Sequence, residues 1–170
     1  MQNLCTIFLW LVLFQFSSAL EAQNTVENTV EEVVAANDSQ LINACVDLVF
    51  EGMLMADSSM VSSAFTKDAL LQTVYETEAD KSPRSGSLPQ FLHMVSQAKE
   101  GFWIEKTVSR KILVNESLAH VWMEYEFYLG DQFLHCGVNS FQLVKIEGKW
   151  KIIYLCDNRQ EKCAFQGTDK

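Results

Sequence analysis

Apolar and polar positions follow a helical period in the first part of the chain and a strand period in the second. From Ser39 to Ala56 polar residues recur every three or four positions, and apolar residues fill the positions between them. A polar stripe this narrow predicts a helix that is buried over most of its surface, with Asp38 or Ser39 capping its start. The stripe consists of Gln40, Asn43, Asp47 and Glu51.

Two shorter helices are predicted after this one. The segment Asp57-Ser58-Ser59 caps a second helix that reaches Phe65. Residues 69–76 are compatible with a strand or a helix, and the polar residues 80–87 form a loop that ends them. Pro89 lies in the first turn of a third helix over Leu88–Lys99, which Gly101 closes.

The rest of the chain has the composition of β-strands. Four runs rich in Val, Ile, Phe, Tyr and Trp are separated by short turn sequences: 102–114, 118–129, 132–146 and 149–158. Helices followed by an antiparallel meander indicate an α+β fold, in which the N-terminal helices pack on one face of a strongly curved antiparallel sheet.

Two turns set a predicted register for this meander. If Gly130-Asp131 and Glu147-Gly148 are two-residue turns, Glu126 lies opposite His135 and Asn139 lies opposite Cys156. Because side chains alternate, one face then holds Trp122, Glu124, Glu126, His135, Asn139, Phe141, Trp150, Tyr154 and Cys156. The other face holds Val121, Met123, Tyr125, Phe127, Cys136, Val138, Val144, Ile153, Leu155 and Asp157. A single bulge would exchange part of either set.

Size and charge narrow the class of protein. A chain of 170 residues with 48% hydrophobic residues suits one domain with an ordinary core. The net charge of −9 and the lack of a basic stripe offer nothing to phosphate backbones or to anionic bilayers. We therefore expect no nucleic acid partner.

The N-terminus has the pattern of a secretory signal peptide. The apolar run over residues 4–16 is too short to cross a bilayer, and small residues follow it, so cleavage is predicted near Ala19 or Ala22. The only positive charge before the run is the amino terminus, so a retained anchor is the alternative. The predicted order is a signal peptide over 1–22, a flexible leader over 23–37, a domain over 38–160 and a tail over 161–170. The mature protein is then secreted or periplasmic and has no membrane partner.

Export changes the interpretation of the cysteines. Four remain after cleavage, an even number in an oxidising compartment: Cys45, Cys136, Cys156 and Cys163. Three pairings are possible and the sequence selects none, while buried free thiols are the alternative. The spacings match no zinc pattern, so we expect neither a metal nor another cofactor.

Three segments of the β half carry a resemblance to a known family. They are Ala119-x-Val121-Trp122-x-x-Tyr125, then His135-Cys136-Gly137, then Gly148-x-Trp150-x-Ile152. Residues 38–160 resemble the putative lumazine-binding branch of the nuclear transport factor 2-like superfamily. The resemblance implies a cone in which a curved sheet wraps helices around an apolar cavity, often as a homodimer through the sheet. Relatives include ketosteroid isomerases, polyketide cyclases and limonene epoxide hydrolases, so the fold alone does not give the function.

Three residues are weak candidates for catalysis. His135 suits a general base, or a core histidine hydrogen-bonded to Glu126. Cys136 points to the opposite face from its neighbour, which argues against a thiol enzyme. Glu124 lies in an apolar strand, where loss of water would raise its pKa, or else at an exposed sheet edge. Asp157 lies at the end of the last strand, where the cone would open.

Other side chains are candidates for binding a ligand. Arg159 pairs with Asp157 or binds a polar group at the mouth of the cone. The aromatic residues that form a stacking wall or part of the core are Trp103, Trp122, Trp150, Tyr125 and Tyr154. Of these, Trp122, Tyr125 and Tyr154 are candidate ligand contacts, together with His135. Asn139 binds a ligand carbonyl or satisfies the backbone at a bend, and Gly137 marks that bend, where a helix or ring comes close.

These observations support three functions, in this order. The first is an exported cone that binds a small apolar or aromatic molecule. The second is a cofactor-independent enzyme of the isomerase or cyclase type that moves a proton with a cavity carboxylate or histidine. The third is a non-catalytic dimeric interaction module.

Overall fold

The computed structural model describes residues 37–75, 82–163 and 165. The chain divides into two units, Met1–Asp38 and Ser39–Lys170, and apart from residues 37 and 38 every described residue belongs to the second unit. The predicted signal peptide, and the leader up to residue 36, lie outside the described residues. Among the helices that the structure describes, none is both long and apolar enough to span a bilayer.

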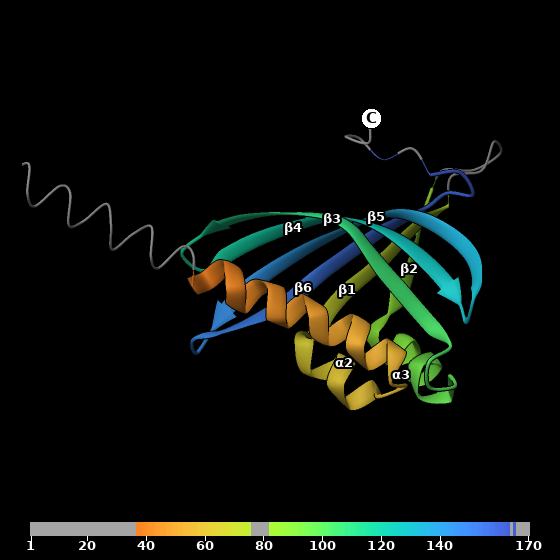
Figure 1. Ribbon diagram of the computed structural model, residues 1–170. Coiled ribbons are helices and arrows are strands. Elements are labelled where there is room, and N and C mark those ends of the chain that lie inside the picture. Colours follow the sequence, from red (N-terminus) through yellow and green to blue (C-terminus); the bar gives the residue numbers. More distant parts are fainter. Residues whose placement is uncertain (1–36, 76–81, 164, 166–170) are drawn as a thin grey trace, which may run out of the picture. The chain divides into compact units, whose positions relative to one another are not determined.

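The second unit has an α+β fold, as the sequence predicted. A curved six-stranded sheet arches over the helices, which lie on its concave side (Figure 1). The strand order is β2-β1-β6-β5-β4-β3. The elements are a helix over residues 37–54, α2 (Ser58–Ala64), β1 (Phe65–Tyr75), β2 (Pro83–Ser87), α3 (Leu88–Gln97), β3 (Trp103–Asn115), β4 (Leu118–Leu129), β5 (Gln132–Ile146) and β6 (Lys149–Arg159).

The three helices lie where the pattern predicted them, with corrections at their ends. Residues 37 and 38 are already helical, so Asp38 and Ser39 lie inside the first helix and the predicted cap was wrong. Asp57 caps α2 as predicted, because its side chain accepts hydrogen bonds from the amides of the next turn. Helix α3 ends at Gln97, before the predicted Lys99, and Gly101 lies in the following turn with φ of 74°.

The segment before α3 differs most from expectation. Residues 69–75, which were compatible with strand or helix, belong to strand β1. β1 pairs in parallel with β6, so the sheet is not wholly antiparallel. The predicted loop over residues 80–87 contains strand β2, a short edge strand exposed on both faces. An edge strand needs no apolar alternation, which is why the sequence pattern missed it.

The meander β3 to β6 matches the predicted runs closely, but its register does not. The two predicted turns are present, since Leu129 pairs with Gln132 and Ile146 pairs with Lys149. Beyond each turn a bulge adds one residue to a strand: between positions 133 and 135 of β5, and between positions 152 and 154 of β6. His135 therefore lies opposite Phe127 rather than Glu126, and Asn139 lies opposite Asp157 rather than Cys156.

The bulges also correct the two predicted faces of the sheet. His135, Asn139 and Phe141 share the concave face with Tyr125 and Phe127, from which the prediction had separated them. Trp122 and Glu124 lie on the convex face, together with Val138. One shifted residue per strand is enough to exchange these sets, because side chains alternate along a strand.

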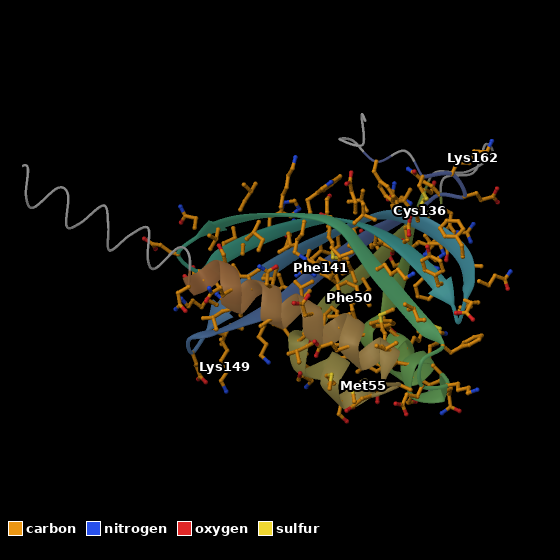
Figure 2. All side chains as sticks on the ribbon, viewed as in Figure 1. Phe50, Met55, Cys136, Phe141, Lys149 and Lys162 are labelled. Atoms are coloured by element: carbon orange, nitrogen blue, oxygen red, sulfur yellow. A yellow bond between two sulfur atoms is a disulfide. The ribbon has the colours of Figure 1, made fainter. Side chains whose placement is uncertain are left out.

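The core lies between the first helix and the concave face. Val46 and Val49 of the helix belong to the same buried cluster as Val121 and Met123 of β4. Phe50 meets Phe141 of β5 edge to face, with ring centres 6.1 Å apart (Figure 2).

Two residues of the helix's polar stripe have a partner on the sheet. The Arg110 guanidinium on β3 donates to Asn43 Oδ1 and to Asp47 Oδ1, both over 2.7 Å. Arg110 is mostly buried, so these charge-assisted bonds fix the helix against the sheet.

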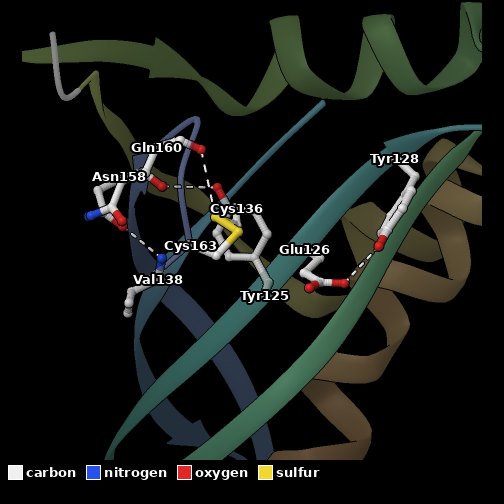
Figure 3. Close-up of a disulfide and its surroundings, with 8 residues drawn as sticks. All are labelled: Tyr125, Glu126, Tyr128, Cys136, Val138, Asn158, Gln160 and Cys163. Carbon is white, nitrogen blue, oxygen red and sulfur yellow. Dashed lines mark hydrogen bonds between the residues drawn. A yellow bond between two sulfur atoms is a disulfide. The ribbon is translucent and has the colours of Figure 1, made fainter. Parts of the chain in front are cut away.

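None of the three complete pairings is present, because two of the four cysteines form a disulfide and the other two stay free. Cys136 on β5 is bonded to Cys163, and the backbone of Cys136 exchanges two hydrogen bonds with that of Gln160 (Figure 3). The disulfide therefore fastens the residues after β6 to β5. Cys45 and Cys156 are free thiols.

Gly137 allows the end of β6 to lie against β5. A Cβ atom at this position would lie 1.9 Å from the backbone oxygen of Asn158, which is far inside van der Waals contact. The Val138 amide donates to Asn158 Oδ1 over 2.6 Å at the same place. The sequence predicted a close approach here, but the approaching group is the β6 backbone rather than a helix or a ring.

This contact predicts a large effect of Gly137→Ala. The new methyl group must push β6 away or distort β5, so we expect the free energy of unfolding in urea to fall by at least about 3 kcal/mol. Gly86→Ala is the matched control, because a Cβ there meets only Leu71 at an ordinary 3.9 Å. Equal urea midpoints for the two variants would show that the contact at Gly137 is not close.

Candidate functional site

A cavity of about 440 Å³ lies between the helices and the concave face of the sheet. Its apolar lining comes from the first helix, α3, the turn before β3 and strands β3 to β6. It consists of Val49, Phe50, Met53, Phe91, Met94, Phe102, Trp103, Phe127, Leu129, Leu134, Phe141 and Leu155. The polar lining is Glu105, Tyr125, His135, Asn139, Asp157 and Arg159. These polar residues all come from strands. The sheet therefore supplies the polar groups of the cavity, and the helices supply the opposite wall.

The bulge in β5 shapes one part of the wall. In a regular strand Leu134 and His135 would point to opposite faces. The extra residue at this position turns both side chains toward the cavity, whose lining they share. Leu134 remains 47% exposed, so it lies at the rim rather than in the interior.

Glu105 is the central polar residue of the cavity. It follows Trp103 by two residues on β3, so strand alternation puts both side chains on the concave face. Its Oε1 accepts a hydrogen bond from Asn139 Nδ2 over 2.6 Å. Burial raises the pKa of Glu105 to about 8, against the smaller lowering effect of the Asn139 hydrogen bond. At neutral pH this carboxyl group is therefore mostly protonated and can donate a hydrogen bond.

Asp157 joins several polar groups at the other end of this wall. Its Oδ1 accepts from Thr73 Oγ1 over 2.5 Å, and its Oδ2 accepts from Arg159 Nε over 3.0 Å. The Tyr125 hydroxyl lies 3.4 Å from Oδ2 and 3.0 Å from the backbone oxygen of Asn158. Burial, and then the charge of Asp157 and that of Glu105 once it ionises, raise the pKa of Tyr125, so it stays a neutral phenol.

His135 is held by rings instead of by a carboxylate. It stacks on Phe127 with ring centres 5.0 Å apart and meets Tyr125 edge to face at 5.8 Å. Burial first, and then the positive charge of Arg159, lower the pKa of His135 to about 4, against an opposing effect of Asp157. The imidazole is therefore neutral at physiological pH. The predicted contact with Glu126 was wrong, because Glu126 accepts from the Tyr128 hydroxyl instead (Figure 3).

Five of the candidate residues from the sequence line the cavity, and three do not. The five are Tyr125, His135, Asn139, Asp157 and Arg159. Trp122 is 46% exposed on the convex face, where Glu124 accepts a hydrogen bond from Ser109 over 2.5 Å. Tyr154 donates to Gln72 over 2.6 Å, outside the cavity lining.

Glu105 was not among the sequence candidates, although a signal for it existed. A carboxylate two residues after a tryptophan, inside a run of strand composition, shares the face of that tryptophan. In the described part of the chain, no three His, Cys, Asp or Glu side chains are grouped so that they could hold a metal ion.

Glu105 predicts a pH dependence of stability. Its pKa is raised in the folded state, so the folded chain holds a proton that the unfolded chain releases between about pH 4.5 and 8. The resulting stability is complete below pH 4.5 and is lost as pH rises through 8. We expect Glu105→Gln to gain on the order of 4 kcal/mol over the wild type between pH 5 and pH 9.

Urea denaturation at both pH values measures this difference. Glu51→Gln, an exposed position on the first helix, is the control for removing one carboxyl group. A constant stability difference between Glu105→Gln and the wild type from pH 5 to 9 would contradict burial as the cause.

Comparisons with known proteins agree with this fold. A search of curated proteins found no match. Among solved structures, an NTF2-like protein of unknown function from Shewanella baltica is 17% identical with a TM-score of 0.60, and the match covers 75% of this chain and 97% of that one. A protein with a cystatin-like fold from Nostoc punctiforme is 16% identical, with 74% and 92% covered and a TM-score of 0.60. An NTF2-like protein from Novosphingobium aromaticivorans is 8% identical, with 81% and 91% covered and a TM-score of 0.63.

At these identities the solved structures show the fold alone. A family model shows the family as well, because it matches residues 37–154, which is more than half of the chain. That segment contains the first helix, α2, α3, β1 to β5 and the first part of β6, and ends just before Asp157 and Arg159. The chain thus belongs to the family described as "Putative lumazine-binding", and its fold is NTF2-like.

Proposed function

We propose that this protein binds a small, mostly apolar or aromatic molecule in its cavity and holds that molecule by one polar end. The observation that carries this proposal is the lining: twelve apolar side chains surround a hollow of about 440 Å³, and the polar side chains all lie on the sheet wall. Ligand sites have this composition, in which apolar surface provides affinity and a few polar groups fix orientation.

The protonation states of the polar side chains in the wall indicate which chemical group of the ligand they bind. Glu105 is mostly protonated at neutral pH, and His135 and Tyr125 are neutral. Glu105 and His135 therefore offer uncharged hydrogen-bond donors, whereas the Asp157 carboxylate on the same wall is paired with Arg159. A carbonyl or hydroxyl oxygen is the partner that such donors bind best.

We also propose where the protein acts and how it assembles. The predicted signal peptide supports binding outside the cytoplasm, in a secreted or periplasmic protein. Exposed apolar side chains on the convex side of β3 and β4 support a homodimer through the sheet. These side chains are Leu113, Leu118 and Trp122.

Proton transfer is the second candidate function. A carboxyl group with a pKa of about 8 is present in both its acid and base forms near neutral pH, as a general acid or base requires. Glu105 replaces Glu124 in this role, because Glu124 lies on the convex face. The reaction would be of the isomerase or cyclase type, without a cofactor.

The binding proposal predicts a fluorescence change that depends on Trp103. This indole lines the cavity, whereas Trp122 lies on the convex face. We expect neutral naphthalene or phenyl ketones to change the tryptophan emission and raise the melting temperature. Trp103→Phe removes the emission change and Trp122→Phe keeps it. No change in emission or melting temperature with any compound of the panel would count against the cavity as a binding site.

The catalytic candidate predicts deuterium exchange in a bound ketone. Proton NMR in D2O follows loss of the hydrogens next to the carbonyl of any ketone that binds. If Glu105 is the base, the catalysed rate rises with pH through about 8, and Glu105→Gln lowers it by about a hundredfold or more. Glu124→Gln is the control and leaves the rate unchanged. Equal rates in the wild type and Glu105→Gln would exclude this carboxylate as the base.

A further inference from the structure

A second hollow of about 160 Å³ adjoins the cavity beside β1, β2 and the start of α3. We call it the side pocket. It shares five lining residues with the cavity: Phe91, Met94, Leu155, Asp157 and Arg159. The rest of its lining is Leu71, Gln72, Thr73, Gly86, Ser87 and Gln90, a more polar set than the cavity has. The shared residues place Asp157 and Arg159 at the junction of the two hollows.

Among the described residues, Arg159 is the side chain at this junction that keeps hydrogen-bond donors without a partner. Its Nε donates to Asp157 Oδ2, but its two terminal amino groups make no hydrogen bond to any residue that the structure describes. Both oxygens of Asp157, in contrast, accept hydrogen bonds. The Arg159 side chain is 39% exposed and the Asp157 side chain only 13%, so the guanidinium is the open member of the pair.

The charges around Arg159 favour an anionic partner. Burial is the largest single effect on the pKa of Arg159 and lowers it, but Asp157, with Tyr75 and Tyr125, raises the pKa above its ordinary value, so the side chain stays a cation. Glu105 is mostly protonated at neutral pH and His135 is neutral. The carboxylate of Asp157 is therefore the main negative charge that a ligand anion would meet, and it is already paired. The two free amino groups of a guanidinium suit a carboxylate, which accepts both at once.

We propose that Arg159 binds the carboxylate of an aromatic or alicyclic monocarboxylic acid whose ring body occupies the cavity, with the acid group at the opening of the side pocket. This inference rests on the proposed binding function and specifies its ligand class. The apolar lining holds the ring, the donors near Glu105 bind a further carbonyl or hydroxyl oxygen of the ring where one is present, and Arg159 selects for the acid.

The test is a matched pair of probes, naphthalene-1-acetate and its neutral amide, titrated into the full-length protein by calorimetry at pH 7. The ring is the same in both, so the difference in Kd measures the effect of the carboxylate against that of a neutral amide. We expect the acid to bind about tenfold more tightly than the amide. Arg159→Gln removes this preference and leaves the binding of the amide within about twofold. Arg84→Gln is the control. The Cζ atoms of Arg84 and Arg159 lie 4.6 Å and 5.4 Å from the centre of the same Tyr75 ring, but Arg84 lines neither hollow.

A second pair of variants tests the side pocket without touching Arg159. Gly86 lines the pocket, and a Cβ there meets Leu71 at an ordinary distance, so Gly86→Val fills the pocket without backbone strain. We expect this variant to weaken binding of the acid by about tenfold and binding of the amide by less than about threefold. Ser85→Val, the next residue of β2, enlarges a side chain outside the pocket lining and leaves both affinities unchanged.

Three outcomes would overturn the proposal. They are equal affinity of the wild type for acid and amide, an acid preference that persists in Arg159→Gln, and an acid preference unaffected by Gly86→Val. In each case binding of the amide still supports the apolar cavity, so the proposed function survives the loss of this inference. If Arg159→Gln does not fold, Gly86→Val and Arg159→Lys decide, since Lys keeps the charge but loses the fork and is expected to give an intermediate preference.

Discussion

The bending of the sheet is the constraint on which the rest of this structure depends. Strands β3, β5 and β6 each contain one irregularity in their pairing, and each irregularity increases the local twist. The sheet therefore curls over the helices, and their side chains do not fill the space beneath it. At Gly137 of β5, the absence of a side chain accommodates the backbone of Asn158 at the end of β6. A flat sheet of the same strands would pack directly on the helices and leave no cavity.

The cavity's chemistry follows from the removal of water around a few polar groups. Burial disfavours the charged form of each group, so Glu105 gains a proton and His135 loses one. Asp157 and Arg159 remain as a charged pair because they face each other at 3.0 Å. The wall consequently carries hydrogen-bond donors and the Arg159 guanidinium, whose terminal amino groups bond to none of the residues described, inside a chain whose net charge is −9. The surface charge of the protein thus gives no guide to the charge that its interior selects.

Similarity to known proteins identifies the fold of this chain. The chemistry of the cavity depends on the side chains that line it. Solved structures with 8–17% identity share the sheet and helices, and a fold of this kind serves many functions. The function of this chain therefore depends on which polar side chains line the cavity and on their protonation states. Asp157 and Arg159, the pair at the junction with the side pocket, fall just beyond the segment that the family model matches.

The sequence by itself determined the elements of this protein and the order in which they occur. Helical and strand periods predicted the first helix, the cap at Asp57 and the four long strands to within a few residues, because these signals act between neighbours in the chain. The edge strand β2 and the parallel pairing of β1 with β6 depend on partners far along the chain, so no local pattern predicted them. The faces were decided only in the tertiary structure. A bulge of one residue reverses every side chain beyond it, and this moved His135 and Asn139 to the side of Tyr125 and left Trp122 and Glu124 outside. The state of Glu105 was decided there too, because its pKa depends on burial and on Asn139, 34 residues away in sequence.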